Sequence, residues 1–238
     1  MEVELMSWMV DTENCMAKAM KGTRGITPAH KLLMSNKCTA SDGSCETCRS
    51  QTNFMSEKEQ KQHCSLCFVH WLRLAKTERH WGVFEDTTMM FSVSGVSRAL
   101  THQLVRHRIA SYKQQSQRHV DPTKMPEWFI VPETIMSLDK HAVDVNVEEY
   151  LDLMDKIAAF YGRLVKAGVP EEDARFILPN ACKTNITITM NGRSLLHFFR
   201  LRLDKHAQWE IRELATKMLE VLQEKFPFIF EGAGELDV

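Results

Sequence analysis

The thirteen residues from 106 to 118, RHRIASYKQQSQR, constrain what this chain can fold into more than any other segment. They contain three arginines, one histidine, two serines and three glutamines, with few apolar residues between them. The run just before them places Val96, Ala99, Leu100 and Leu104 at the spacing of an amphipathic helix. We therefore expect a helix that leads into a loop filled with hydrogen-bond donors, a pattern typical of a site for phosphates or carboxylates. A solvated basic patch is the alternative.

Periodicity in the rest of the sequence predicts an α+β fold, with an antiparallel or mixed sheet and long helices. Apolar alternation predicts strands at residues 2–10, 88–94 and 184–190, and Gly95 is expected to end the second of these. Ser97 is expected to cap the helix before the arginine-rich segment. At 238 residues the chain is expected to form a single domain over 1–238. Further helices are expected at residues 12–20, 68–75, 147–166, just after Pro170, and over 211–222.

Charge and hydropathy exclude several classes of protein. The net charge of −1 gives no overall field that would draw the chain to nucleic acid or to a membrane, so its basic clusters suit a small anionic ligand. No apolar run is long enough to span a bilayer. The first fifteen residues lack the basic and apolar regions of a signal peptide. The chain has seven cysteines, an odd number that cannot all pair in disulfides. These features predict a cytoplasmic protein without a disulfide framework.

Four cysteines form two Cys-x-x-Cys pairs, at Cys45, Cys48, Cys64 and Cys67. Two short chelate loops separated by fifteen residues are the spacing of a four-thiolate zinc knuckle or ribbon. We expect a structural zinc in an insertion over about residues 38–70, a polar segment with little apolar core of its own. A redox pair, free thiols, His63 as a substitute ligand, and iron in place of zinc are the alternatives.

Three blocks of sequence resemble the flavin-dependent thymidylate synthases. The first is the arginine-rich segment 106–118, which matches the family pattern R-H-R, seven residues, S-x-R. The second is MNGRSLLHFFRLRLDKHAQWEIREL at 190–214, and the third is DARFILPNAC at 173–182. The blocks follow the order of the family, and the likeness extends over roughly residues 80–226. The resemblance implies the family's fold and its homotetrameric assembly.

The activity that the resemblance implies is the reductive methylation of dUMP to dTMP. Methylene-tetrahydrofolate would give the carbon, and FAD would carry a hydride that NADPH supplies. Such chemistry belongs to the cofactor, while the protein binds, orients and stabilises charge. Two alternatives stay open. One is a related flavoenzyme acting on another pyrimidine nucleotide, and the other is a zinc-ribbon module that binds nucleic acid or a partner protein on the same scaffold.

The resemblance also assigns residues. For dUMP they are Gln103, Arg106, Gln114, Ser116, Arg118, Arg175 and Arg202, with Arg202 as the catalytic residue that stabilises charge developing on the uracil. For FAD they are Arg106, His107, Arg108, Asn191, Arg193, His197 and His206. Simpler roles compete with four of these. Arg175 and Arg202 could pair with nearby acids such as Glu171, Asp173 or Asp204. His206 could cap a helix or pack, and His197 could be a core histidine.

Four positions depart from the pattern of the family. Gly82 stands where Ser or Thr is usual, Asp86 where His is frequent, Lys113 where Asn is common, and His119 where Tyr is common. Loss of one hydroxyl contact at Gly82 would weaken FAD binding by about 1 kcal/mol. A carboxylate at Asp86 would repel a phosphate. The departures therefore concern the affinity for the cofactor and the choice of substrate.

Elemental analysis tests the cysteine hypothesis. Protein purified under reducing conditions without chelators should contain about one zinc per chain, and Cys48→Ser with Cys67→Ser should release it and lower stability. Such a metal should have no catalytic role, because four protein sulfurs leave no open position. Protein that holds neither zinc nor iron contradicts the hypothesis.

Overall fold

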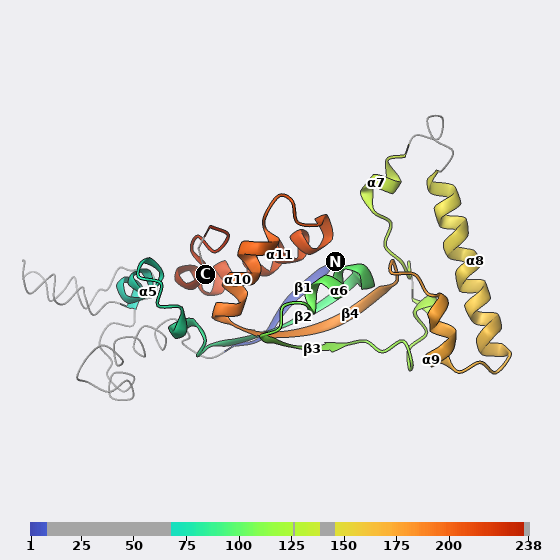
Figure 1. The fold of residues 1–238 in the computed structure, drawn as a ribbon, viewed down its shortest axis with the longest axis horizontal. Coiled ribbons are helices and arrows are strands. Elements are labelled where there is room, and N and C mark those ends of the chain that lie inside the picture. The colour runs from blue at the N-terminus through green and yellow to red at the C-terminus, as the bar shows by residue number, and fades with distance from the viewer. Residues whose placement is uncertain (9–67, 126, 139–145, 236–238) are drawn as a thin grey trace, which may run out of the picture. The chain divides into compact units, whose positions relative to one another are not determined.

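The computed structural model describes residues 1–8, 68–125, 127–138 and 146–235 (Figure 1). Within these ranges the chain has the expected α+β fold. The four cysteines of the Cys-x-x-Cys pairs and the helix expected at 12–20 lie outside them. No helix in the described part of the chain has the length and apolar character needed to cross a bilayer. The strands are β1 Glu2–Ser7, β2 Thr88–Ser97, β3 Ala110–Gln114 and β4 Lys183–Asn191.

The four strands form one sheet in the order β1-β2-β4-β3. Backbone contacts at the two ends of the β2–β4 pair fix its direction. Gly192 N, just after β4, donates to Thr87 O, just before β2, at 3.1 Å. Arg98 N, just after β2, donates to Cys182 O, just before β4, at 3.0 Å. The start of one strand therefore lies beside the end of the other, and the pair is antiparallel.

One face of these central strands is buried, as the alternating pattern predicted. In β4 every second residue is buried, and the inward side chains are Thr184, Ile186, Ile188 and Met190. In β2 the first three inward residues are Met89, Phe91 and Val93, each fully buried. Because successive side chains of a strand point to opposite faces, this alternation also fixes the register of the sheet.

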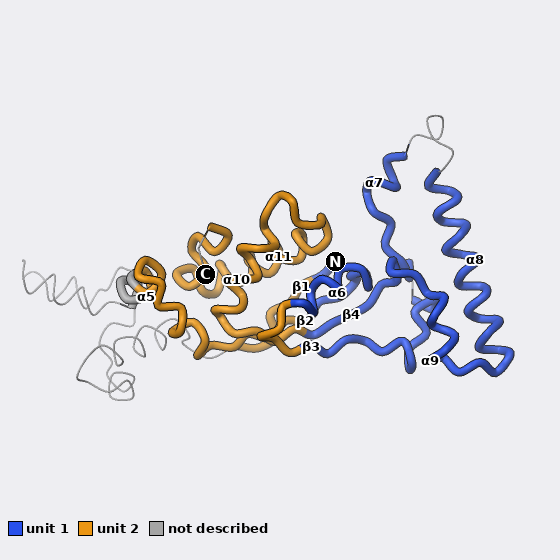
Figure 2. The backbone as a smooth tube through the Cα atoms, in the orientation of Figure 1, with its two compact units in different colours: residues 1–2, 92–106, 112–187 blue, residues 3–91, 107–111, 188–238 orange. Residues whose placement is uncertain are grey.

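The described residues divide into two compact units (Figure 2). The boundary falls within all four strands, since each unit takes one part of each strand. The single domain expected over 1–238 stays a prediction. Unit 1 comprises residues 1–2, 92–106 and 112–187, and unit 2 comprises residues 3–91, 107–111 and 188–238.

Unit 1 contains the helix before the arginine-rich segment and the long helix of the second half. Ser97 caps α6 Arg98–Leu104 as predicted, because its hydroxyl accepts from Leu100 N at 2.9 Å. Helix α8 Val147–Lys166 has the predicted bounds and begins with a capping box formed by Asn146 and Glu149. Short helices follow at α9 Glu171–Ala174 and at η3 Arg175–Ile177. Trp128, Met154 and Cys182 form a buried cluster beneath them.

Unit 2 is built around three helices from the C-terminal part of the chain. They are α10 Gly192–Arg202, α11 Trp209–Lys225 and α12 Pro227–Phe230. Phe199 packs edge-on against Phe198 and against Phe230, with ring centroids 5.6 and 5.9 Å apart. Helix α5 Phe68–Thr77 and the 3-10 helix η1 Trp81–Phe84 complete the unit. The helices predicted at 68–75 and 211–222 are therefore confirmed, and α10 was not foreseen.

The structure corrects two expectations about the arginine-rich region. Gly95 does not end β2 but lies inside it with a φ of 68°, a conformation that glycine adopts without strain. The expected loop contains strand β3. This strand is held by polar contacts, since Tyr112 Oη donates to Leu104 O at 2.9 Å and Gln114 Nε2 donates to Thr101 Oγ1 at 3.0 Å. A strand held in this way shows no apolar alternation.

Gly192 marks a close approach between segments of unit 2, and this predicts a large effect of a single methyl group. A Cβ at Gly192 would lie 2.8 Å from Phe84 O and 2.9 Å from Thr87 Oγ1. Because a backbone oxygen cannot move away easily, Gly192→Ala should destabilise the protein by about 1–3 kcal/mol in urea unfolding. Gly162→Ala in α8 is the control, since its Cβ meets nothing within 4 Å. It should stabilise by about 0.5–1 kcal/mol. Equal effects of the two substitutions would contradict the prediction.

Candidate functional site

The residues assigned from the sequence fall into two groups, one in each unit. The four cysteines assigned to a metal lie outside the described residues. Unit 1 contains Gln103, Arg106, Gln114, Ser116, Arg118 and Arg175. Unit 2 contains His107, Arg108, Asn191, Arg193, His197, Arg202 and His206.

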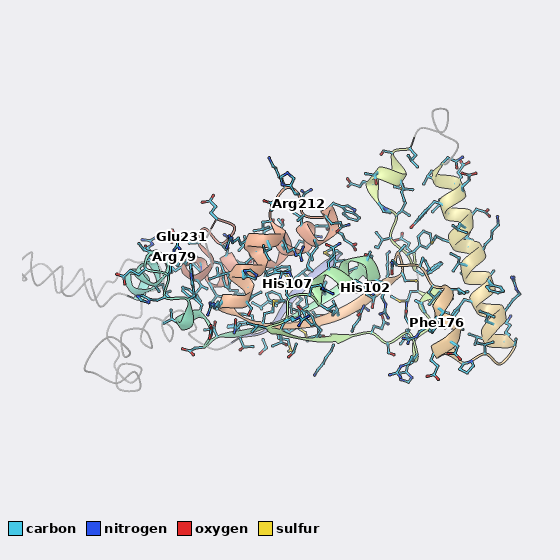
Figure 3. All side chains as sticks on the ribbon, in the orientation of Figure 1. Arg79, His102, His107, Phe176, Arg212 and Glu231 are labelled. Carbon is cyan, nitrogen blue, oxygen red and sulfur yellow. The ribbon has the colours of Figure 1, made fainter. Side chains whose placement is uncertain are left out.

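The centre of the unit 2 group is a hydrogen bond between Arg202 and His107. Arg202 Nε donates to His107 Nε2 at 3.0 Å, and both side chains are half-buried (Figure 3 labels His107). Burial, followed by the positive charge of Arg202 and then by His197, lowers the pKa of His107 to about 4. His107 is therefore neutral at pH 7, and because its Nε2 accepts a hydrogen bond, its proton lies on Nδ1.

Aromatic neighbours fix the plane of the His107 ring. Phe198 lies edge-on to it with centroids 5.0 Å apart, and His197 lies at 6.3 Å. His197 is exposed, so the alternative of a buried core histidine does not hold for it. Phe198 is fully buried and anchors the same turn of α10.

Asp204 does not pair with Arg202, so that alternative is also not found. Asp204 Oδ1 instead accepts from the backbone N of His206 at 2.8 Å and contacts its Nδ1 at 2.9 Å. These hydrogen bonds, the backbone one first, lower the pKa of Asp204. His206 is exposed, and its ring orientation is set by this carboxylate.

Three further residues of the unit 2 group differ in how much of their hydrogen-bonding capacity is already used. Asn191 Oδ1 caps α10 by accepting from Ser194 N at 2.8 Å, so only its amide nitrogen is left for a ligand. Arg193 Nη1 donates to Glu85 Oε1 in an ion pair. Arg108 is exposed and makes no ion pair with any described residue, which leaves its whole fork for an anion.

In unit 1 a short turn presents Arg118. Ser116 Oγ accepts from Arg118 N at 3.2 Å, and Ser116 O accepts from Val120 N at 3.1 Å. Ser116 therefore shapes the backbone that carries the arginine. Gln103 is half-buried, and Arg106 follows the end of α6 with its side chain exposed. Gln114 uses its amide to join β3 to α6 and, through Thr184 Oγ1 at 3.4 Å, to β4.

Arg175 does not pair with Glu171. Its Nε donates to Glu172 O at 3.1 Å, and it makes no ion pair within the described ranges. It lies close enough to Arg98 that its charge, after burial, lowers the pKa of Arg98. Two neighbouring guanidinium groups without a described carboxylate partner favour an anionic ligand.

Arg98 is a residue that the sequence reasoning missed. Its Nη2 donates to Gln115 O at 3.4 Å, while its Nε is buried without a hydrogen-bond partner. An orphaned buried donor on a charged group is costly unless a ligand meets it. A signal existed in the sequence, because a positive residue right after the N-cap Ser97 opposes the helix dipole and so breaks a local rule.

Several arginines of unit 1 have no carboxylate partner among the described residues. Five arginines of this unit make no ion pair with a described carboxylate, although acids are as numerous as basic residues in the whole chain. They are Arg98, Arg106, Arg118, Arg163 and Arg175, of which Arg163 lies over the Phe160 ring, 5.2 Å from its centroid. Arginines without carboxylate partners, of which Arg98 and Arg175 are partly buried, favour a phosphate-bearing ligand, which the fork of a guanidinium binds with two hydrogen bonds.

Comparison with known proteins identifies the family. The sequence model of the thymidylate synthase complementing protein family matches residues 5–228. The chain belongs to this family. A flavin-dependent thymidylate synthase of Sulfolobus acidocaldarius is 44% identical over 164 residues, which cover 69% of this chain and 60% of that protein. Those of Geobacter sulfurreducens and Pyrococcus furiosus are 47% and 49% identical over 157 and 148 residues.

These matches leave part of each relative uncovered. They span 60%, 65% and 59% of the lengths of the three proteins. A crystal structure of thymidylate synthase X from Helicobacter pylori with FAD and dUMP shares the fold, with a TM-score of 0.65. It is 20% identical, and the match covers 99% of both chains. The recognition of the family from its three sequence blocks is confirmed.

The departures from the family pattern all lie at exposed positions. A Cβ at Gly82 would meet nothing within 4 Å, so a larger residue would fit there. Asp86 makes no ion pair with a described residue, whereas its neighbour Glu85 pairs with Arg193. Lys113 and His119 are exposed as well. None of the four is required for the packing of the described part of the chain.

The His107–Arg202 contact predicts how His107 titrates. In NMR its pKa should be about 4, and Arg202→Met should raise it because a positive neighbour and a donor to Nε2 are lost. Because the folded pKa lies below the usual 6.5, His107 contributes stability that is present above pH 6.5 and is lost as the pH falls toward 4. Arg212→Met, which removes a guanidinium bonded to Lys205 O, is the control. A His107 pKa that rises equally in both variants would refute the assignment.

Proposed function

We propose that this chain catalyses the reductive methylation of dUMP to dTMP, with methylene-tetrahydrofolate as carbon donor and FAD and NADPH as the redox pair. Family membership and the names of its relatives support the proposal. The observation that carries it is the set of arginines in unit 1 without carboxylate partners, three of which, Arg106, Arg118 and Arg175, stand at family positions for dUMP. A folate and a nucleotide would both be bound as anions.

The reaction replaces a hydrogen on C5 of the uracil with a methyl group. The carbon arrives from methylene-tetrahydrofolate at the oxidation level of formaldehyde, tetrahydrofolate leaves, and the ring loses the C5 proton. Bound FAD, reduced by NADPH, would supply the hydride that turns this carbon into a methyl group. The residues of the chain would bind the reactants, orient them and stabilise the charge that develops.

The phosphate of dUMP would be bound by Arg118 and Arg175, with Arg98 as a third guanidinium. Arg98 has an unused buried Nε and lies near Arg175, so a phosphate oxygen would satisfy it. Ser116 would hold the turn that presents Arg118. Gln103, Arg106 and Gln114 complete the proposed dUMP set.

Arg202 would stabilise negative charge on the uracil. One nitrogen of its fork is engaged by His107, and Nη1 and Nη2 are left to face the ring. Because His107 is neutral, it orients the guanidinium without cancelling its charge, as a carboxylate would. A preoriented positive group that meets developing charge lowers the barrier rather than the ground state.

FAD would be held by Arg106, His107, Arg108, Asn191, Arg193, His197 and His206. This donor set fits a cofactor that carries a pyrophosphate, since Arg108 has no described carboxylate against it and Asn191 keeps its amide nitrogen.

The assembly, the location and the cysteine cluster stay part of the proposal. We propose a cytoplasmic homotetramer with a structural zinc bound by Cys45, Cys48, Cys64 and Cys67. Large apolar side chains exposed on unit 1 support burial in an assembly, since an interface would remove their apolar surface from water. They are Leu151, Leu153 and Phe160 on α8, and Phe176, which is 84% exposed.

Incubation of the protein with dUMP, methylene-tetrahydrofolate, NADPH and FAD tests the function directly. We expect dTMP and tetrahydrofolate in equal amounts, and no dTMP when FAD is removed. Replacement of dUMP by dCMP tests the alternative of another pyrimidine nucleotide. If no dTMP forms with any reduced nicotinamide, the proposal is wrong for this chain.

Kinetics should separate the arginines. Arg202→Met should lower turnover by about 100-fold with little change in dUMP affinity, because its charge is needed only as the reaction proceeds. Arg118→Met and Arg98→Met should weaken dUMP by roughly tenfold or more, yet leave the affinity for deoxyuridine unchanged, because each loses a charged contact to phosphate. Isothermal titration and steady-state rates measure both effects. Parallel changes in all three variants would contradict this division of roles.

A further inference from the structure

The ion pair between Glu85 and Arg193 joins two segments that are far apart in sequence. Arg193 lies in the first turn of α10, and Glu85 follows the 3-10 helix η1. Arg193 Nη1 donates to Glu85 Oε1, and the side chains are 46% and 47% exposed. Each group is thus partly shielded and still reaches solvent, where a ligand could meet it.

The backbones that carry this pair are fastened independently of it. Gly192 N donates to Thr87 O at 3.1 Å, and Gly192 packs against Phe84 O with no room for a side chain. Glu85 N donates to Gly82 O at 3.0 Å, and Phe84 is fully buried. Because the two backbones are already fixed, the ion pair adds little to the docking of the segments. Its effect is to fix the long side chain of Arg193.

The geometry of a guanidinium lets one arginine serve two anions. Arg193 has five N–H donors in a planar fork, and the structure engages one nitrogen, Nη1, with Glu85. The remaining donors, on Nε and Nη2, are available to a phosphate. An arginine that is already held in one rotamer loses less conformational freedom when the phosphate binds.

We propose that Glu85 is a positioning residue that holds Arg193 in the orientation that binds FAD. This inference rests on the proposed function, because it takes FAD as the ligand of Arg193. Glu85 itself does not touch the cofactor. Its carboxylate fixes the guanidinium through Nη1 and turns Nε and Nη2 toward the ligand.

The next residue in the chain provides a matched control. Asp86 carries the same charge one position further on, is exposed, and makes no ion pair with any described residue. Asp86→Asn therefore removes one negative charge from the same neighbourhood and leaves the Glu85–Arg193 pair intact. If negative charge simply repelled the cofactor, Glu85→Gln and Asp86→Asn would both strengthen FAD binding.

FAD affinity, measured by quenching of flavin fluorescence on the full chain, tests the proposal. The variants are Glu85→Gln, Asp86→Asn, Arg193→Met and the double variant Glu85→Gln with Arg193→Met. Glu85→Gln should weaken FAD about fivefold to tenfold, which is the coupling typical of a contacting charge pair. Asp86→Asn should leave affinity unchanged or raise it. The double variant should bind no more weakly than Arg193→Met alone, because Glu85 acts through Arg193.

A second measurement separates positioning from folding. Urea unfolding without FAD should show little loss of stability in Glu85→Gln, since half-exposed ion pairs contribute little. Tighter FAD binding in Glu85→Gln, or additive effects in the double variant, would overturn the proposal while the proposed function stands. A wild-type chain that binds no FAD would overturn the proposed function and this inference with it.

Discussion

The contact of Gly192 with the segment 84–87 is the constraint on which the rest of unit 2 depends. The backbone hydrogen bond to Thr87 O and the close approach to Phe84 O fix the point where β4 ends and α10 begins. Asn191 caps the helix that starts there, and Arg193, His197 and Arg202 lie on it, so a shift at this point would move them together. A methyl group is enough to cause such a shift, which explains why glycine stands at the first position of a helix where its low propensity is a disadvantage.

Charge placement explains how a chain with a net charge of −1 can present an anion site. Several of its acids are paired with basic residues elsewhere, as in Asp152 with Lys156, Glu213 with Lys217, and Glu231 with Arg73. The arginines of unit 1 are left without such partners, so their full charge is available to a ligand. The net charge of the chain therefore does not predict its ligand. Guanidinium groups without carboxylate partners do indicate a ligand class, because they favour an anion.

The sequence predicted those parts of the structure that depend on local pattern. Strands with apolar alternation, the capped helices α6 and α8, and the family itself could all be found from residues near one another in the chain. Strand β3 could not, because it depends on Thr184, which lies 70 residues from Gln114. The same holds for the site. Arg98 shows its orphaned Nε only once the chain is folded, and the partners of Arg193 and Arg202 lie 108 and 95 residues away.

The neutral state of His107 links the chemistry of unit 2 to its packing. Burial against Phe198 disfavours the charged ring, and the nearby Arg202 disfavours it further. The neutral ring in turn accepts from Arg202 Nε, so the guanidinium gains an orientation without losing its charge. Protonation of Nε2 would turn the acceptor into a donor and place two positive groups in contact. The hydrogen bond would then break, and Arg202 would lose its orientation. The low pKa of His107 is therefore the condition under which Arg202 can be held by a hydrogen bond instead of by a carboxylate.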